Sequence, residues 1–503
     1  MGDFIPAQTG LSRVFIIEGR ARPDHAPEYQ SCMRGQALSK SFGDVTDIEC
    51  PDPNRPGAYV KIGEVQAGDE RATLTLEGRY AIDMRSRMLQ LAQRKCALDV
   101  QLHFGDCEDL SNHNNFKKIL FLEDARLLSY DTEDLGSLQS ADSAPINETV
   151  ELSATTIYDI IKQSYSQKAD DVVTTEVVDV VFCDEISCGE CEDESTGCEK
   201  WYAVTIQAGG SPGTPPDVVF SIDDGITWYA DDIDTLGAAE DPTAVGCVMG
   251  YLVVTSNDTN SVHIVDLDEL NGETDPVFEE VDDGFVAGGE PNDIASVGTK
   301  AWIVGDFGYV YVMTDPTAGV TVQDAGVATV SVLNAVDALN SNVAVAVGHD
   351  GVVIFTEDGE TWQVTGTNPV GPGVHLDAVA VKTKEVWFVG DDNGFLWYTL
   401  DGGLTWSLKA FTGDGNGSGI TDIDFATDSI GYLSQITDDP IGRILATYNG
   451  GYDWVVMPLG DGVMPETLGL NAVAACTNEP ELVVAVGLGE NLDSDGIIIL
   501  GSM

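Results

Sequence analysis

Four cysteines within 16 residues form the densest group of chemically active side chains in the sequence: Cys183, Cys188, Cys191 and Cys198. Thiolates this close together suit a tetrahedral metal ion, most often zinc, but the same cysteines would also suit two local disulfides, or one disulfide and free thiols. All of these interpretations predict a staple that stiffens a junction between domains. The remaining cysteines are expected to be small core residues: Cys32, Cys50, Cys96, Cys107, Cys247 and Cys476.

Aspartate-rich loops are the second group of possible ligands. They are Asp231-Asp232-Ile233-Asp234, Asp414-Gly415-Asn416-Gly417 and Asp493-Ser494-Asp495-Gly496. Their oxygens would suit calcium, although such loops are also common in solvated turns. No Gly-x-Ser-x-Gly, His-Glu-x-x-His or P-loop signature occurs, and the six histidines are scattered. The sequence therefore predicts a protein that is not an enzyme.

A repeated motif ending in tryptophan runs through residues 201–503. Its four copies end at Trp228, Trp362, Trp406 and Trp454, with spacings of 134, 44 and 48 residues. Pairs of short apolar strands precede the copies, as in Ala344–Gly348. A period of 40–49 residues made of short strands is typical of a β-propeller. We predict seven blades starting near residues 201, 243, 291, 331, 375, 420 and 469, the last completed by residues 496–500 together with the strands after residue 201.

The repeated motif resembles the Asp-box, or BNR, motif Ser-x-Asp-x-Gly-x-Thr-Trp of sialidases, some glycosidases, sortilin-type receptors and photosystem assembly factors. The copies align as Ser221, Asp223, Gly225, Thr227 and Trp228; Glu357, Gly359, Thr361 and Trp362; Thr399, Asp401, Gly403, Thr405 and Trp406; and Asn449, Gly451 and Trp454. The resemblance implies a hairpin between the outer strands of a blade, in which carboxylate and hydroxyl bond turn amides and tryptophan packs between blades. These residues are expected to stabilise turns rather than to touch a ligand.

The arginine content of the repeat region argues against a sialidase. That family holds the substrate carboxylate with three arginines, because guanidinium groups bind it bidentately. Residues 201–503 contain one arginine, Arg443. Other glycosidases need only two carboxylates, but among 47 acidic residues in this region a suitable pair arises by chance.

The first 170 residues predict a β-rich α+β domain. Alternating apolar and polar residues indicate strands near residues 14–17, 72–76, 98–104, 118–122 and 149–153. An amphipathic helix is expected at Ile82–Lys95 and a shorter one from Thr156 to Gln167. The stretch of residues 40–60, with three prolines, is expected to be an irregular loop. We therefore divide the chain into residues 1–170, a cysteine-rich acidic connector of residues 171–200 and a propeller of residues 201–503.

The N-terminal pattern is similar to that of tail tube proteins of long-tailed phages and archaeal viruses. The helix at residues 82–96, followed directly by a strand at residues 97–104, resembles a step of that fold. The resemblance implies a mainly β protein: a β-sandwich with one packed helix, followed by the seven-bladed propeller. It also implies a virion structural protein, a tail tube subunit that forms stacked hexameric rings with propellers outside. Other tail proteins would be its partners, and DNA would pass through without specific binding.

Net charge limits the choice of partners. The chain carries 84 acidic and 24 basic residues, a net charge of −60, of which residues 201–503 contribute −42. Such a surface repels nucleic acid and anionic membranes, and it is typical of a protein from a salty habitat or of one that binds divalent cations. The first residues lack a signal peptide pattern, which predicts assembly in a host cytoplasm. Two alternatives to the tail tube function remain. One is a propeller that binds a host-surface glycan or protein through exposed aromatic residues such as Trp397 or Tyr229, and the other is a photosystem-assembly-factor-like or glycosidase-like propeller.

Overall fold

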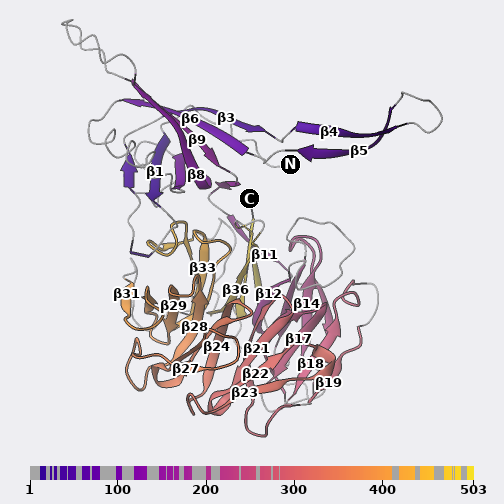
Figure 1. Cartoon of the computed structure of the whole chain (residues 1–503). Helices are drawn as coiled ribbons and strands as arrows, with labels where there is room; N and C mark the ends of the chain where they lie inside the picture. The colour runs from indigo at the N-terminus through magenta and orange to yellow at the C-terminus, as the bar shows by residue number, and fades with distance from the viewer. Residues whose placement is uncertain are drawn as a thin grey trace, which may run out of the picture. The chain divides into compact units, whose positions relative to one another are not determined.

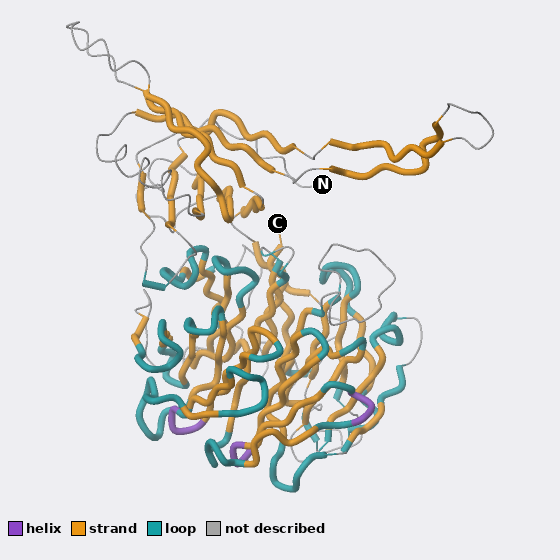
Figure 2. Tube along the Cα trace, in the orientation of Figure 1, coloured by secondary structure: helices purple, strands orange, loops and turns teal. Residues whose placement is uncertain are grey.

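The chain divides into two compact units, Met1–Lys162 and Gln163–Met503. The computed structural model describes residues 12–18, 23–24, 28–30, 34–41, 44–51, 59–67, 71–79, 98–104, 118–132, 147–154 and 156–161 of the first unit, and residues 164–168, 175–183, 200–205, 216–236, 240–256, 261–272, 276–282, 284–409, 419–436, 442–457, 469–477, 480, 482–488 and 496–502 of the second. Strands dominate both units (Figure 2). Among the described residues, no helix is long and apolar enough to span a membrane.

The first unit contains an antiparallel sheet of eight described strands and a separate hairpin (Figure 1). The sheet order is β2-β1-β7-β8-β9-β6-β3, with β10 paired to β8. The strands are β1 (Ser12–Glu18), β2 (Glu28–Gln30), β3 (Arg34–Ser41), β4 (Asp44–Pro51), β5 (Tyr59–Ala67), β6 (Arg71–Arg79), β7 (Leu98–Phe104), β8 (Lys118–Thr132), β9 (Asn147–Ala154) and β10 (Thr156–Ile161). All five strands predicted for this region are present.

Strand β8 organises this sheet because its two halves have different neighbours. Its first half pairs with β7 and β10, and its second half pairs with β9. Alternate apolar residues from these strands, such as Val100, Leu122 and Leu152, are fully buried in one core. The alternation that predicted the strands is thus the one that builds the core.

Two expectations for the first unit were wrong. The segment Thr156–Gln167 forms β10 and part of β11 rather than a helix, because open strand edges offer it backbone partners that outweigh its helical spacing of isoleucines. The stretch of residues 40–60 is not wholly irregular, since β4 and the start of β5 pair there as a hairpin with Pro51 inside β4. The helix expected at Ile82–Lys95 lies outside the described residues.

The second unit is a β-propeller of seven four-stranded antiparallel sheets in its described part. The first strands of neighbouring blades contact one another in a closed ring, so they are innermost. They are β12 (Val177–Phe182), β16 (Pro242–Val248), β20 (Pro291–Val297), β24 (Leu333–Asn340), β28 (Leu376–Val381), β32 (Gly419–Asp424) and β36 (Gly469–Ala475). The second strands are β13 (Trp201–Thr205), β17 (Tyr251–Ser256), β21 (Lys300–Gly305), β25 (Val343–Gly348), β29 (Trp387–Asp391), β33 (Gly431–Ile436) and β37 (Val483–Leu488).

The outer strands follow in the same blade order. The third strands are β14 (Asp217–Ser221), β18 (Val262–Asp266), β22 (Tyr309–Met313), β26 (Val353–Thr356), β30 (Leu396–Thr399), β34 (Arg443–Thr447) and β38 (Gly496–Ser502). The fourth are β15 (Tyr229–Asp232), β19 (Glu279–Val281), β23 (Thr321–Ala325), β27 (Gln363–Val364), β31 (Ser407–Lys409), β35 (Val455–Val456) and, for the seventh blade, β11 (Ser164–Lys168). The described part of the propeller also contains the short 3₁₀ turns η2 (Asp306–Gly308), η3 (Pro316–Ala318) and η4 (His349–Gly351).

Ring closure differs from the prediction. The seventh blade takes its outer strand from β11, which precedes the first blade, rather than from strands after residue 201. The first blade begins at β12, so the predicted connector of residues 171–200 contains an innermost strand of the propeller. The long segment between β12 and β13 hid this hairpin in the sequence. The other six blades begin within two residues of their predicted starts.

In three blades a glycine at or near the end of the second strand lets that strand approach the first. A Cβ atom on Gly305, Gly348 or Gly487 would lie 2.0–2.2 Å from a carbonyl oxygen at or beside the start of the innermost strand of its blade. The turn after Gly305 and Gly348 then donates a backbone N–H to that same carbonyl. The Val-Gly pair at or near the end of these three strands in the sequence is therefore a packing requirement of their blades.

Candidate functional site: carboxylates at the propeller axis

Five aspartates on innermost strands of the described propeller all have raised pKa values. They are Asp179, Asp293, Asp337, Asp422 and Asp424, which we call the axial carboxylates. They lie on four blades, yet the charges of Asp179, Asp293 and Asp422 repel one another. Because these three come from the first, third and sixth blades, they face each other across the propeller axis.

Each axial carboxylate joins its own blade to the next one. Asp293 accepts a hydrogen bond from the backbone N–H of Ile294 on its own strand at 2.8 Å and from that of Val336 on β24 at 2.7 Å. Asp179 does the same with Val180 and Val245, both at 2.8 Å. The N–H groups on the inner edge of a blade have no further strand to pair with, so a carboxylate from the preceding blade satisfies them.

The other three carboxylates repeat this geometry. The donors on the next blade are Val381 for Asp337 at 2.6 Å, Val473 for Asp422 at 2.9 Å and Ala475 for Asp424 at 2.7 Å. In all five cases the residue before the donor is alanine: Ala244, Ala335, Ala380, Ala472 and Ala474. A small side chain beside the donor leaves space for the carboxylate. An aspartate on one innermost strand and an alanine at the matching position of the next therefore identify the contact in the sequence.

Burial raises the pKa of every axial carboxylate. It raises the pKa of Asp179 to about 7, with repulsion from Asp293 as the next cause, while the bonds from Val245 and Val180 lower it. The pKa values of Asp293 and Asp424 rise to about 6, and that of Asp422 rises well above the ordinary value for the same reason. Some of these groups therefore hold protons near neutral pH.

Polar side chains form a second set of inter-blade contacts beside the axial carboxylates. At five of the seven interfaces a side-chain amide or hydroxyl donates to a backbone carbonyl of the next blade. The pairs are Thr243 to Pro291 at 3.1 Å, Asn292 to Leu333 at 3.0 Å, Asn334 to Leu376 at 3.1 Å, Thr421 to Leu470 at 2.7 Å and Asn471 to Val177 at 2.9 Å. The centre of the propeller is thus held by polar contacts that fix the blades to one another.

The four tryptophan-ended turns lie between the third and fourth strands of the first, fourth, fifth and sixth blades. In the first of them Ser221 accepts from the N–H of Gly225 at 3.0 Å, and Asp223 accepts from that of Thr227 at 2.7 Å. The corresponding contacts of Thr399 with Gly403 and Asp401 with Thr405 are 3.0 and 2.8 Å, and those of Thr447 with Gly451 and Asn449 with Asp453 are both 2.9 Å. The residues bond turn amides as the motif implies.

The turn of the fourth blade corrects the sequence alignment. Asp358 accepts from the N–H of Thr361 at 2.7 Å, and Thr356 accepts from that of Gly359 at 3.0 Å. Glu357, aligned with the motif aspartate, instead forms an ion pair with Lys384 at 3.2 Å. This turn is one residue shorter than the others, which shifted the alignment. The bond from Thr361 lowers the pKa of Asp358 to about 2.

The tryptophans of these turns pack at blade interfaces. Trp228 shares a core with Leu500 of the seventh blade, Trp362 shares one with Trp302 of the third, and Trp454 shares one with the fifth. Two lysines form hydrogen bonds across the same interfaces. Lys300 donates to the carbonyl of Gly359 at 2.7 Å, and Lys382 donates to that of Gly450 at 3.2 Å. The turns and these lysines thus serve the packing of the ring.

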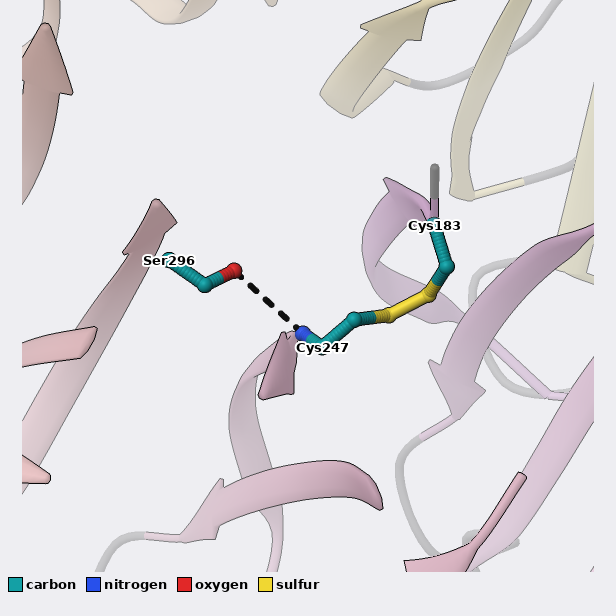
Figure 3. Close-up of a disulfide and its surroundings, with 3 residues drawn as sticks. All are labelled: Cys183, Cys247 and Ser296. Carbon is teal, nitrogen blue, oxygen red and sulfur yellow. Dashed lines mark hydrogen bonds between the residues drawn. A yellow bond between two sulfur atoms is a disulfide. The ribbon is translucent and has the colours of Figure 1, made fainter. Parts of the chain in front are cut away.

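One cysteine of the cluster pairs with a cysteine outside it. Cys183, at the end of β12, forms a disulfide with Cys247 on β16, with their Cα atoms 5.8 Å apart (Figure 3). Cys247 was expected to be a plain core residue, so this expectation was wrong, as was that for Cys476, which is also disulfide-bonded. Cysteines that share an interface in space are far apart in sequence, which hid their pairing. Cys188, Cys191 and Cys198 lie outside the described residues.

In the described part of the chain, no group of three or more His, Cys, Asp or Glu residues is placed to hold a metal ion. Of the three aspartate-rich loops, the described one contains Asp232, whose carboxyl group pairs with Asp217 on the neighbouring strand. Burial and this contact raise the pKa of Asp217. Residues 414–417 and 493–495 lie outside the described residues.

Comparison with solved structures finds other propellers. One is a structure described as YCF48 bound to D1 peptide, with 14% identity and a TM-score of 0.48 over 68% of this chain and 96% of that one. Another is YCF48 from Cyanidioschyzon merolae, with 15% identity and a TM-score of 0.47 over 67% of this chain and 98% of that one. No protein-family model matches the chain. No curated protein matches it either.

Proposed function

We propose that the protein is a non-catalytic binding protein whose propeller is a rigid scaffold for a protein partner. The observation that carries this proposal is the use of the axial carboxylates. The carboxylates of Asp179, Asp293, Asp337 and Asp422 each accept hydrogen bonds from backbone N–H groups on two blades. They therefore hold neighbouring blades together rather than face a substrate. The motif carboxylates Asp223, Asp358 and Asp401 are likewise bonded within their turns.

A protein partner suits the surface better than a glycan. Glycan binding would use exposed aromatic faces with polar groups beside them. Tyr229 stacks on Phe220 with ring centroids 5.5 Å apart, and both Tyr229 and Trp397 are half-buried. The Trp397 indole N–H donates to Asp391 at 3.1 Å. The two aromatic residues considered for glycan recognition are therefore engaged inside the blades.

The experiment is a binding screen of the full chain against two arrays, one of glycans and one of peptides that vary in charge and apolar content. The proposal predicts salt-sensitive binding to peptides and no turnover of any glycan. Hydrolysis of a glycan, or binding confined to the glycan array, would overturn it.

A second candidate function, the tail tube subunit, is favoured by the hairpin β4–β5. These strands pair only with each other among the described residues, and the hairpin continues outward from the sheet of its unit (Figure 1). A two-stranded hairpin alone is barely stable in water. Contact with a neighbouring copy would stabilise it, as stacked hexameric rings in a virion tail would provide.

Electron microscopy of the full chain in low and in molar salt tests this second function. Rings or stacked tubes are the expected result, and only dispersed particles of 53.6 kDa in every salt would contradict it. The disulfide between Cys183 and Cys247 adds a condition, because disulfides persist in oxidising surroundings rather than in most cytoplasms. Samples should therefore be compared with and without reductant.

A further inference from the structure

The third blade displays an exposed apolar cluster on two neighbouring loops. Phe307 is 59% exposed in the turn between β21 and β22, and Val327 and Val330 are 88% and 74% exposed in the loop that leads to the fourth blade. We call these three side chains the Phe307 patch. Single exposed apolar residues are ordinary, but three on adjoining loops are a surface that water solvates poorly.

The two loops that carry the patch are locked together. A Cβ atom on Gly308 would lie 2.0 Å from the carbonyl oxygen of Thr329, and one on Gly326 would lie 2.7 Å from that of Phe307 and 3.7 Å from the Val330 side chain. The turn and the loop therefore interlock through glycines, which lets their backbones approach each other.

A buried carboxylate fixes the loop further. Asp324, which is 5% exposed, accepts hydrogen bonds from the N–H groups of Val327 at 2.6 Å and Ala328 at 3.0 Å. Thr329 accepts from the N–H of Ser331 at 3.1 Å. The patch is thus preorganised, so a partner would lose little loop entropy on binding it.

Phe307 adopts a backbone conformation that is unfavourable for phenylalanine. It adopts φ 53° and ψ 24°, in the left-handed region that bulky residues rarely occupy. The matching turn of the fourth blade places Asp350 there with φ 58°, and the Asp350 carboxylate accepts from the N–H of Gly373 at 2.8 Å. Phe307 has neither such a bond nor burial to offset the strain. A strained, exposed aromatic residue indicates that its display is useful.

Charge around the patch is negative. Asp306 precedes Phe307, and its N–H donates to the carbonyl of Glu290, so the backbones of two acidic residues adjoin the turn that carries the ring. The Asp306 carboxylate accepts a hydrogen bond from the Asn292 side-chain amide at 3.2 Å. Three lysines of the third and fifth blades lie at the other end of the strands. Lys300 begins β21, and Lys382 and Lys384 lie in the turn between β28 and β29. A cationic partner would therefore meet no repulsion from them at this end.

From the exposure, rigidity, strain and charge of these residues, we propose that the Phe307 patch is the docking site for a segment of a partner protein that carries an apolar side chain between lysines or arginines. This proposal rests on the protein-binding function above and names its site and the chemistry of the partner. The apolar side chain would rest on Phe307, Val327 and Val330, and its cationic neighbours would face Asp306 and Glu290. Patches this small give weak, transient complexes.

The probes are synthetic dodecapeptides with a central phenylalanine or serine, flanked by lysines or by glutamates. Binding to the full chain is measured by fluorescence anisotropy at 50 and 500 mM salt. The lysine-flanked phenylalanine peptide should bind best and lose affinity in high salt. Phe307→Asn should weaken it at least tenfold, which is the effect expected from losing the central anchor of an interface.

Met249→Asn is the matched control. Met249 is 43% exposed and also left-handed, with φ 50°, but it lies in the turn between β16 and β17, at the opposite end of the strands. Asparagine tolerates this backbone, so both variants should melt no lower than the native chain. Equal loss in both variants, or equal binding of the phenylalanine and serine peptides, would overturn the docking site.

The remaining outcomes separate this inference from the proposed function. Peptide binding that Phe307→Asn leaves unchanged would overturn the site alone. No binding of any peptide would overturn the site and also contradict the protein-binding function. Self-association of the full chain that Phe307→Asn abolishes, measured by sedimentation equilibrium, would make the patch a contact between copies and would also overturn the proposal.

Discussion

The Asp293 carboxylate and the backbone N–H of Val336, 43 residues apart, meet at 2.7 Å across the interface of the third and fourth blades. Replacing Asp293 with alanine should leave this N–H and that of Ile294 without an acceptor. We expect a loss of about 2 kcal/mol in the free energy of unfolding. The measurement is urea denaturation at pH 5, which is below the Asp293 pKa of about 6. Asp293 is mostly protonated in the folded chain at this pH, so the loss reports on the hydrogen bonds and not on a buried charge. Glu279→Ala, at an exposed position, is the control and should change little.

Stability should fall as pH rises from about 4 to 7, opposite to ordinary acid denaturation. The pKa values of Asp179, Asp293 and Asp424 are raised in the folded state from 3.8 to between about 6 and 7. Between those limits the folded chain binds more protons than the unfolded chain, so deprotonation favours unfolding. Each carboxylate should contribute roughly 3 kcal/mol. Urea denaturation at several pH values checks this trend.

A variant separates the axial carboxylates from the surface charge, which also disfavours folding as pH rises. Asp179→Asn should flatten the pH dependence, whereas Asp268→Asn, at an exposed position, should not. An equal slope in both variants would assign the effect to the surface. The turn carboxylate of Asp358, with its pKa lowered to about 2, acts only below pH 4 and leaves this window unaffected.

Much of the propeller could be predicted because its chemistry is local. Each blade repeats apolar strands and a turn whose partners lie within four residues, as Ser221 and Gly225 do. The axial carboxylates were missed because their partners lie in another blade, as with Asp179 and Val245, 66 residues apart. The signal was present as an aspartate in one repeat and an alanine at the same place in the next. It appears only when the innermost strands are aligned.

The disulfide and β11 were missed for the same reason. Nothing near Cys183 in the sequence indicates Cys247, and nothing in the helical spacing of residues 157–161 reveals that the following segment closes a ring with β38. Periodicity reports which face of a segment is apolar, but an open strand edge elsewhere in the chain decides between helix and strand.

The corrected turn of the fourth blade predicts unequal effects for two neighbouring carboxylates. Asp358→Ala should lower the thermal midpoint, because the N–H groups of Glu360 and Thr361 lose their acceptor. Glu357→Ala should leave it nearly unchanged, since Glu357 loses only a half-exposed ion pair with Lys384. Differential scanning calorimetry of the two variants decides between the alignments. A larger drop for Glu357→Ala would restore the original one.

The bond between Cys183 and Cys247 should stabilise the propeller by tying the first blade to the second. It closes a loop of 64 residues, and the chain-entropy estimate for such a loop is on the order of 4 kcal/mol. Cys247→Ser should therefore lower the urea midpoint, and reductant should lower that of the native chain but have less effect on the variant. Peptide mapping without reduction should recover the fragment with Cys183 joined to that with Cys247. Two outcomes would contradict this bond and support the local arrangement that the cysteine spacing suggests. One is recovery of Cys183 joined to Cys188, Cys191 or Cys198, and the other is zinc retained in native mass spectra without the bond between Cys183 and Cys247.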